Sequence, residues 1–224
     1  DHSWYATRYN GRPLSAPLQR RNLDVHQDTI AEHLKLGSEA YATALFGKWH
    51  VSQDFLRNHP AYGFDHTKIT HSSSEYADGD PKRIFSYADT AIDFMTDRVN
   101  SQEPFYLQLS HSAPHGPFEA RQSTLDKYNN LPPGARHSDP LYAAMTEDLD
   151  ASVGMVLDHI DQLGIRDNTY IVYVSDNGSI AALGPDVNAP LYHAKGTIFE
   201  GGIRVPMIVA GPGIAANSVS DVPV

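Results

Sequence analysis

The stretch 169–178 constrains the fold more than any other part of the sequence. Residues 170–174 form an apolar run of β-branched and aromatic residues, the composition of a strand that is buried on both faces. The following segment, Ser175–Gly178, has the composition of a turn. The Asp176 carboxylate and the Asn177 amide are also the hard oxygen donors that Ca²⁺ and Mg²⁺ prefer. The sequence therefore predicts a central strand that ends in an ordinary turn or in part of a metal site, and these residues alone favour the turn.

Two further apolar runs indicate strands at residues 41–46 and 105–109. Each of the three strands follows a segment with the 3.6-residue period of a helix. We place these helices at residues 29–37, 86–100 and 139–163. Helices that alternate closely with strands are typical of an α/β fold, with a mostly parallel or mixed central sheet and helices on both faces. The length of 224 residues favours a single domain over residues 1–224.

Capping residues mark where the predicted helices begin. Thr29 and Glu32 have the spacing of a capping box, and Ser86 with Asp89 resembles one. The pair Asp139–Pro140 supplies an N-cap and a proline at the first helical position. These signals predict where each of the three helices begins.

Two other segments indicate a long loop and a further strand. Residues 52–82 form a long polar stretch, which indicates a binding loop or lid. The apolar run 203–210 contains Pro206, which removes a backbone donor and therefore predicts an edge or bulged strand.

Polar side chains follow all three predicted strands. They are Lys48 and His50 after the first strand, His111 and His115 after the second, and Asp176 and Asn177 after the third. In α/β sheets, ligands bind beyond the carboxyl ends of the strands. Because three strand ends carry polar groups, the sequence predicts a functional site at that edge of the sheet.

Lys48 and His50 lie two residues apart after a strand, so both can face one pocket while Trp49 packs the other way. Lysine can hold an anion and histidine can move a proton. The alternative is a surface lysine beside a packed histidine. A Ser-His-Asp triad could combine Ser110, His50 and Asp176, but no G-x-S-x-G motif supports it.

His111 and His115 could suggest a zinc site, but Pro114 prevents the helical spacing that such a pair of ligands needs. We therefore expect one structural histidine and assign the chemistry to His115. Asp148 and Asp150 lie on the third predicted helix, where a solvated face is the expected role.

The segment 200–202 predicts a turn with close backbone approach, because glycine occupies two of its three positions. Glu200 at its start is expected to pair with Arg204.

Composition limits the classes of partner. The chain has 27 acidic and 17 basic residues, a formal net charge of −10, which argues against nucleic acid and anionic membrane surfaces. It has no cysteine, and therefore no disulfide, thiolate metal site or thiol nucleophile. No apolar run reaches membrane-spanning length, and the first residues lack the features of a signal peptide.

Four motifs together resemble the type I sulfatases, which have the alkaline-phosphatase-like fold. The motifs are Gly47–His50, Ala113–Pro117, Ser175–Gly178 and Lys195–Pro206, and they come in the order of that family. The resemblance implies a hydrolase of small-molecule or glycan sulfate esters that uses Ca²⁺, or Mg²⁺, and a formylglycine made from a cysteine. It also implies a periplasmic or secreted location.

The resemblance also implies roles for single residues. Asp176 and Asn177 match the metal ligands of the family, Lys48 and Lys195 the sulfate-binding lysines, and His50 and His115 the catalytic histidines. If both arguments hold, the tips of these six side chains line one pocket, with neighbours roughly 3–8 Å apart.

The sequence departs from the family pattern in one respect. Sulfatases carry an upstream Asp pair and a C-x-P-x-R segment that supplies the nucleophile, and this chain has neither. Residues 6–9 resemble the stretch just after that segment, so we expect a partial domain that lacks its nucleophile segment and its C-terminal part. Two alternatives remain, a phosphonate monoester or phosphodiester hydrolase of the same fold and a non-catalytic sulfatase-like binding module.

Overall fold

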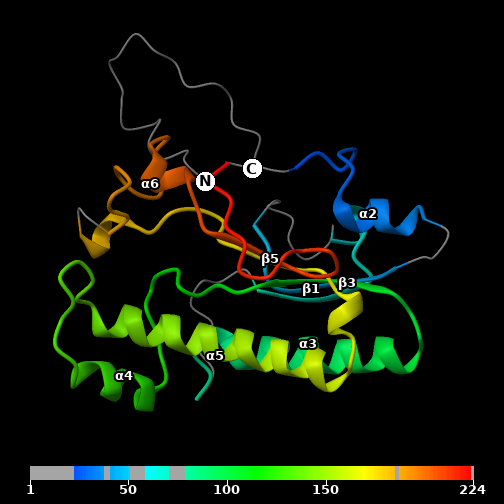
Figure 1. Ribbon diagram of the computed structural model, residues 1–224, viewed down its shortest axis with the longest axis horizontal. Helices are drawn as coiled ribbons and strands as arrows, with labels where there is room; N and C mark the ends of the chain where they lie inside the picture. Colours follow the sequence, from blue (N-terminus) through cyan, green and yellow to red (C-terminus); the bar gives the residue numbers. More distant parts are fainter. Residues whose placement is uncertain (1–22, 38–40, 51–58, 71–78, 185–186, 223–224) are drawn as a thin grey trace, which may run out of the picture. The chain divides into compact units, whose positions relative to one another are not determined.

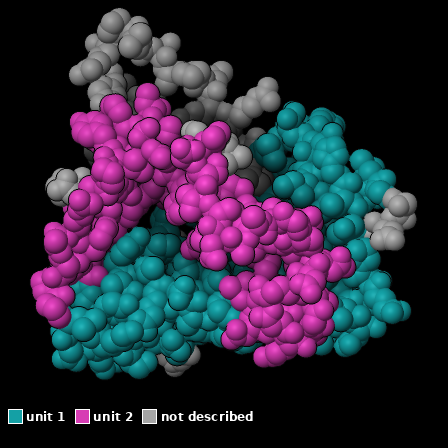
Figure 2. All heavy atoms as spheres, viewed as in Figure 1, with its two compact units in different colours: residues 1–131, 140–156 teal, residues 132–139, 157–224 magenta. Residues whose placement is uncertain are grey.

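The computed structural model describes residues 23–37, 41–50, 59–70, 79–184 and 187–222. The chain divides into two compact units (Figure 2). Unit 1 comprises residues 1–131 and 140–156, and unit 2 comprises residues 132–139 and 157–224. The single domain over residues 1–224 stays a prediction.

Unit 1 contains a sheet of three parallel strands (Figure 1). The strand order is β2-β1-β3, with β1 (Ala42–Lys48) between β2 (His66–Thr70) and β3 (Phe105–Ser110). The predicted first and second strands are therefore confirmed. The five central positions of β1 are buried, as expected for a strand with neighbours on both edges and helices on both faces.

The α-helices of the described residues are α2 (Ile30–Lys35), α3 (Ile84–Asn100), α4 (Gln122–Asn129), α5 (Pro140–Gln162) and α6 (Glu200–Ile203). Short 3₁₀ helices are η1 (His59–Tyr62), η2 (Pro81–Arg83), η3 (Arg166–Asn168) and η4 (Ala181–Leu183). The predicted start of the third helix at Pro140 is confirmed, and Gly164 follows its end with φ +68°.

Successive side chains of β1 enter two different cores, because the side chains of a strand alternate between its faces. Leu45 packs with Ala31 of α2 on one face. Phe46 packs with Phe94 of α3 on the other face, with ring centroids 5.8 Å apart. Figure 1 shows α2 on one side of this sheet and α3 beside α5 on the other. The predicted α/β arrangement with helices on both faces is confirmed in this unit.

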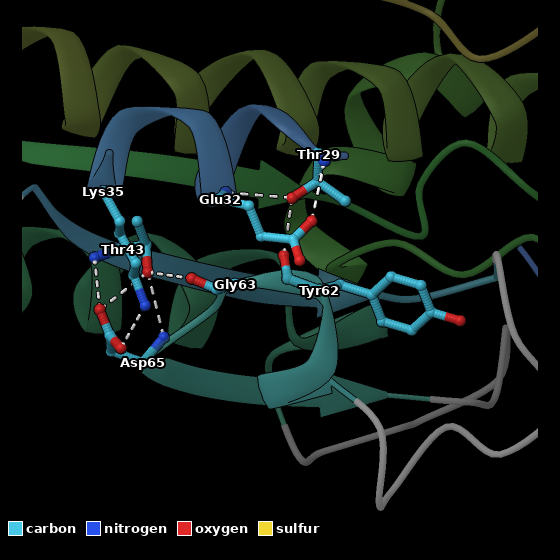
Figure 3. A network of polar contacts seen from close by, with 7 residues as sticks. All are labelled: Thr29, Glu32, Lys35, Thr43, Tyr62, Gly63 and Asp65. Carbon is cyan, nitrogen blue, oxygen red and sulfur yellow. Dashed lines mark hydrogen bonds and ion pairs between the residues drawn. The ribbon is translucent and has the colours of Figure 1, made fainter. Parts of the chain in front are cut away.

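The capping box predicted for α2 is present (Figure 3). Glu32 N donates to Thr29 Oγ1 at 3.1 Å, and Thr29 N donates to Glu32 Oε2 at 2.8 Å. Thr29 Oγ1 also donates to the Tyr62 carbonyl oxygen at 2.9 Å. The N-terminus of α2 is thus attached to η1 as well as capped.

A second polar group in Figure 3 connects β1 to the turn before β2. The Thr43 hydroxyl contacts the Gly63 carbonyl and the Asp65 carboxylate, and Lys35 pairs with Asp65. Partial burial acts to raise the pKa of Asp65, but hydrogen bonds from Lys35 and Thr43 outweigh it and hold that pKa below its usual value.

The predicted start of α3 was wrong. The helix begins at Ile84, and its cap comes from Asp80, whose carboxylate accepts from Phe85 N at 2.8 Å and from Ser86 N at 3.0 Å. The Ser86 hydroxyl also donates to Asp80. Asp80 directly precedes η2, and η2 leads directly into α3.

The polar stretch 52–82 is not wholly a loop. Residues 66–70 form β2, which pairs with β1, so the loop prediction was wrong there. Residues 51–58 and 71–78 lie outside the described residues, and the lid prediction for them stays a prediction. Helix α4 also lies in a segment for which no element was predicted.

Unit 2 contains a two-stranded antiparallel sheet of β4 (Ile171–Val174) and β5 (Met207–Ala210). The strand prediction for β4 is confirmed, but burial on both faces was wrong, because Val172 is 56% and Val174 54% exposed. Among the residues that the structure describes, β4 pairs with β5 alone, so its apolar run does not lie inside a covered multi-stranded sheet there. The edge strand predicted around Pro206 begins immediately after that proline.

Candidate functional site

The end of β1 carries the first pair of predicted site residues. Lys48, the last residue of β1, is half-buried, and His50 is exposed. Trp49 between them is buried, with its ring centroid 5.2 Å from that of Tyr62 and 6.0 Å from that of Phe64. The prediction that Trp49 packs into the interior is confirmed.

Gly47 places the end of β1 against the end of β3. Gly47 is paired with Ser110, and its φ is +105°. A Cβ at Gly47 would lie 2.1 Å from the Ser110 carbonyl oxygen, so a larger residue does not fit. The strand ends that precede Lys48 and His111 are therefore neighbours in one sheet.

The loop 111–121 follows β3 and carries His115. Residues 111–120 have no helix or strand, so the absence of helix expected around Pro114 is confirmed. His115 N donates to the Ser112 carbonyl oxygen at 2.9 Å, and His115 Nδ1 lies 2.6 Å from the Gly116 carbonyl oxygen. A carbonyl accepts only, so Nδ1 carries the proton in this contact. The neutral ring then has its basic lone pair on Nε2, which is the nitrogen suited to proton transfer.

His111 has a different environment. Burial lowers the pKa of His111 to about 4, and the nearby Asp80 carboxylate acts in the opposite direction without overcoming it. The ring is therefore neutral near pH 7. Its Nε2 lies 3.4 Å from Ser152 Oγ of α5. These contacts support His111 as the structural histidine of the loop.

Asp148 was wrongly placed on a solvated face. It is 0% exposed and accepts from Arg121 N at 2.7 Å, Arg121 Nε at 2.9 Å and Thr124 Oγ1 at 2.7 Å. Asp150 is exposed, as predicted. The signal that could have found Asp148 is its spacing within α5, since it shares the i, i+3, i+4, i+7 face of the buried residues Met145, Leu149 and Ser152.

Lys82 is a further candidate site residue, and no sequence motif indicates it. It is 2% exposed and has φ +58°. Burial lowers the pKa of Lys82, Glu119 acts in the opposite direction, and the positive charge of Lys48 adds to the lowering. A buried cation thus lies within electrostatic range of the predicted sulfate-binding lysine of unit 1.

In unit 2, hydrogen bonds bring the turn after β4 next to the segment of Lys195. Ser175 Oγ donates to the Asn177 carbonyl oxygen at 2.9 Å, and Asp176 is exposed. Lys195 N donates to the Ser179 carbonyl oxygen at 2.9 Å. The backbone of Lys195 is therefore bonded two residues beyond Asn177.

Glycines make this arrangement possible. A Cβ at Gly178 would lie 1.8 Å from the Gly201 carbonyl oxygen, and a Cβ at Gly201 would lie 1.9 Å from that of His193. The predicted close backbone approach is confirmed, but the predicted turn was wrong, because residues 200–202 belong to the short helix α6. The predicted pair is present too, with Arg204 Nη1 3.6 Å from Glu200 Oε2.

The structure thus groups the predicted residues in two sets. Lys48, His50 and His115 belong to unit 1, while Asp176, Asn177 and Lys195 belong to unit 2. Convergence of all six on one pocket stays a prediction.

The predicted metal ligands supply a carboxylate and an amide oxygen. Such donors suit Ca²⁺, which takes about six to eight oxygens, so Asp176 and Asn177 fit as part of a larger ligand set. Across the described ranges, no three His, Asp or Glu side chains gather in a group that could hold a metal. In the same ranges, no helix has the length and apolar character needed to cross a membrane.

Comparison with known proteins identifies the family. The family described as Sulfatase matches residues 5–224. The chain belongs to the sulfatase family. It is therefore a member of a hydrolase family with an alkaline-phosphatase-like fold, as the four motifs predicted.

Individual sulfatases agree with this assignment. The chain is 36% identical to a sulfatase of Formosa agariphila over 156 residues, covering 64% of this chain and 28% of the relative. It is 28% identical to the N-acetylgalactosamine-6-sulfatase of Rattus norvegicus, covering 98% of this chain and 46% of the relative. The crystal structure of Ps i-CgsB in complex with k-i-k-neocarrahexaose matches with a TM-score of 0.66 and 26% identity, covering 77% of this chain and 45% of that one. The chain spans less than half the length of these relatives.

Proposed function

We propose that this sulfatase-family chain forms the substrate-facing part of a sulfuric ester hydrolase that cleaves a sulfate monoester. The observation that carries the proposal is the arrangement of the loop 111–121. It follows a strand end adjacent to that of Lys48, and it presents a histidine whose tautomer is set by the Gly116 carbonyl. A lysine at one strand end and an oriented histidine after the neighbouring strand end suit an ester with a permanent negative charge.

Lys48 and Lys195 would hold the sulfate oxygens. Both side chains are half-buried, and partial removal from water strengthens the attraction between an ammonium group and an anion. In unit 2, Asp176 and Asn177 would hold a divalent metal, Ca²⁺ or Mg²⁺, which when bound neutralises negative charge on the sulfate group. The remaining oxygen ligands would come from outside these two residues.

The two histidines would move protons at different stages. His115, with Lys195 beside the ester, would act in its protonated form: it would give its Nε2 proton to the departing alcohol and be left as the neutral ring with its proton on Nδ1. His50, exposed after the end of β1, would accept the proton released when sulfate leaves. The nucleophile of such an enzyme is a formylglycine derived from cysteine, and this chain contains no cysteine. We therefore expect the 224-residue chain alone to be inactive and to bind Ca²⁺ weakly.

We further propose a sulfated glycan as the substrate. Support comes from Ps i-CgsB, whose structure contains k-i-k-neocarrahexaose and which is 26% identical to this chain. The rat relative is named for a sulfated amino sugar. The net charge of −10 makes a polyanion an unexpected partner for the surface as a whole, so the glycan would be recognised locally at the lysines.

Paired substrates test the proposal. The complete natural protein that contains this chain should hydrolyse 4-nitrophenyl sulfate and a sulfated oligosaccharide faster than the matching phosphodiester or phosphonate monoester. Asp176→Ala should abolish hydrolysis of both sulfate esters, and His115→Ala should abolish hydrolysis of the sulfated oligosaccharide, whereas the exposed Asp150→Asn should do neither. A preference for the phosphonate ester would instead establish the related hydrolase of the same fold. Binding of the glycan without hydrolysis would establish a non-catalytic module.

A further inference from the structure

Helix α5 contacts both ends of the loop that carries His115. Ser152 and Asp148 lie one helical turn apart on α5 and therefore on the same face. Ser152 Oγ lies 3.4 Å from His111 Nε2 at the start of the loop. Asp148 accepts from Arg121 N at 2.7 Å at the end of the loop. His115 lies between these two attachments.

The attachment at Asp148 is a buried, fully engaged carboxylate. Its two oxygens accept from the backbone and the guanidinium of Arg121 and from the hydroxyl of Thr124. The guanidinium carbon of Arg121 lies 4.2 Å from the centre of the Phe85 ring, which restricts the arginine further. Asp148→Asn would replace one of these two oxygens by an NH₂ group, which would face a donor in a buried position, a large perturbation for one atom changed.

The attachment at Ser152 joins three elements. Ser152 is buried, and its Oγ lies 2.9 Å from the Ile84 carbonyl oxygen at the start of α3 as well as next to His111. Between the two polar attachments, Ala113 of the loop packs with Met145 and Leu149 of α5. Polar contacts at both ends and an apolar contact near the first therefore hold the loop along one face of the helix.

The position of the His115 ring depends on the conformation of this loop. Its backbone N–H bonds to Ser112 and its Nδ1 bonds to Gly116, both within the loop. We propose that Asp148 and Ser152 are positioning residues, which fix the loop so that His115 Nε2 meets the departing alcohol. The inference rests on the proposed function, and it adds to that function two residues on a helix that bears none of the sulfatase motifs.

Positioning makes a prediction that simple loss of stability does not. Protonation of the leaving group matters most for a poor leaving group, such as the hydroxyl of a sugar. It matters little for 4-nitrophenolate, which departs readily without a proton. A displaced His115 should therefore slow hydrolysis of a sugar sulfate selectively, whereas partial unfolding would lower both rates by the same factor.

The variants for the test are Asp148→Asn and Ser152→Ala in the complete natural protein, with Asp150→Asn as the matched control on the exposed face of α5. For Asp148→Asn, kcat/KM on the sugar sulfate should fall about 10- to 100-fold, with the loss mainly in kcat. On 4-nitrophenyl sulfate it should stay within about threefold, since the general acid contributes little there. Ser152→Ala should show the same selectivity with a smaller loss, and it decides the question if Asp148→Asn does not fold. Equal losses on the two substrates, or no loss, would overturn the proposal.

Hydrogen exchange separates this inference from the proposed function. The His115 amide, bonded to the Ser112 carbonyl, should exchange at least about tenfold faster in both α5 variants than in Asp150→Asn, because local opening becomes easier. The Leu45 amide in β1 should exchange at an unchanged rate. This result would support positioning of the loop even if the protein cleaved no sulfate ester. An unchanged His115 amide would refute it even in an active sulfatase.

Discussion

Replacing Thr43 by valine tests how β1 is attached to the turn before β2. Thr43 is fully buried, and its Oγ1 lies 2.6 Å from the Gly63 carbonyl oxygen and 2.9 Å from Asp65 Oδ2. The same oxygen accepts from Asp65 N at 3.1 Å. Valine keeps the branched shape of threonine, so Thr43→Val removes the hydroxyl with little change in packing volume.

The size of the effect follows from which partners are left without a hydrogen bond. Asp65 N keeps a second acceptor, the Thr43 carbonyl at 3.0 Å, and the Asp65 carboxylate keeps Lys35. The Gly63 carbonyl loses a short bond in a buried position. An unsatisfied buried group costs about 1–3 kcal/mol, more than the roughly 0.5–1.5 kcal/mol of an average hydrogen bond. We therefore expect Thr43→Val to lower the free energy of unfolding by about 1–3 kcal/mol.

Urea unfolding followed by tryptophan fluorescence measures this loss, because Trp49, one of the two tryptophans, packs in the same core as Leu45 of β1. The matched control is Thr146→Val, at an exposed residue whose hydroxyl bonds to the Tyr142 carbonyl of its own helix. The control should change the free energy of unfolding by less than about 0.5 kcal/mol. If Thr43→Val cost no more than the control, the hydroxyl would not hold β1 to the turn.

Two further predictions concern charge and glycine. Hydrogen bonds from Lys35 and Thr43 lower the pKa of Asp65 despite its partial burial, so the stabilisation that Asp65 contributes is present above its unfolded-state pKa of about 3.9 and is lost as the pH falls through the lower folded-state pKa. Urea midpoints between neutral and acid pH should therefore depend less on pH in Lys35→Gln than in the wild type, and an identical dependence would contradict the role of the pair. Gly201→Ala should destabilise unit 2, since its Cβ would lie 1.9 Å from a carbonyl oxygen, whereas Gly154→Ala in α5 meets no atom within 4 Å and should stabilise the helix by about 0.5–1 kcal/mol. Thermal unfolding of the two variants decides this, and equal shifts would refute it.

Features set by neighbouring residues could be predicted from the sequence. The capping box at Thr29 and the start of α5 at Pro140 depend on a few adjacent side chains, and both are present. The close backbone approach at Gly201 was predictable for the same reason, because only glycine tolerates it. The sulfatase motifs are also local, and they identified the family.

Features set by distant partners could not be predicted in this way. The strand β2 has a polar, mixed sequence and exists because it pairs with β1. The spacing of Asp148 within α5 indicates its buried face, but its hydrogen-bond donors, Arg121 and Thr124, lie 27 and 24 residues away in the chain and have no local signal. The apolar run of β4 predicted burial, but its exposure depends on how many strands and helices surround it, which residue type alone does not determine.

The most direct test of the account is a crystal structure of the complete natural protein, grown with Ca²⁺ and a non-hydrolysable sulfate ester analogue. The account predicts that the analogue is surrounded by the six predicted site residues, namely Lys48, His50, His115, Asp176, Asn177 and Lys195. Neighbouring tips should lie roughly 3–8 Å apart, the range set by direct contact or one intervening ligand atom. A structure with Asp176 at the metal but His115 or Lys195 remote from the sulfate group would contradict the proposed sulfatase site.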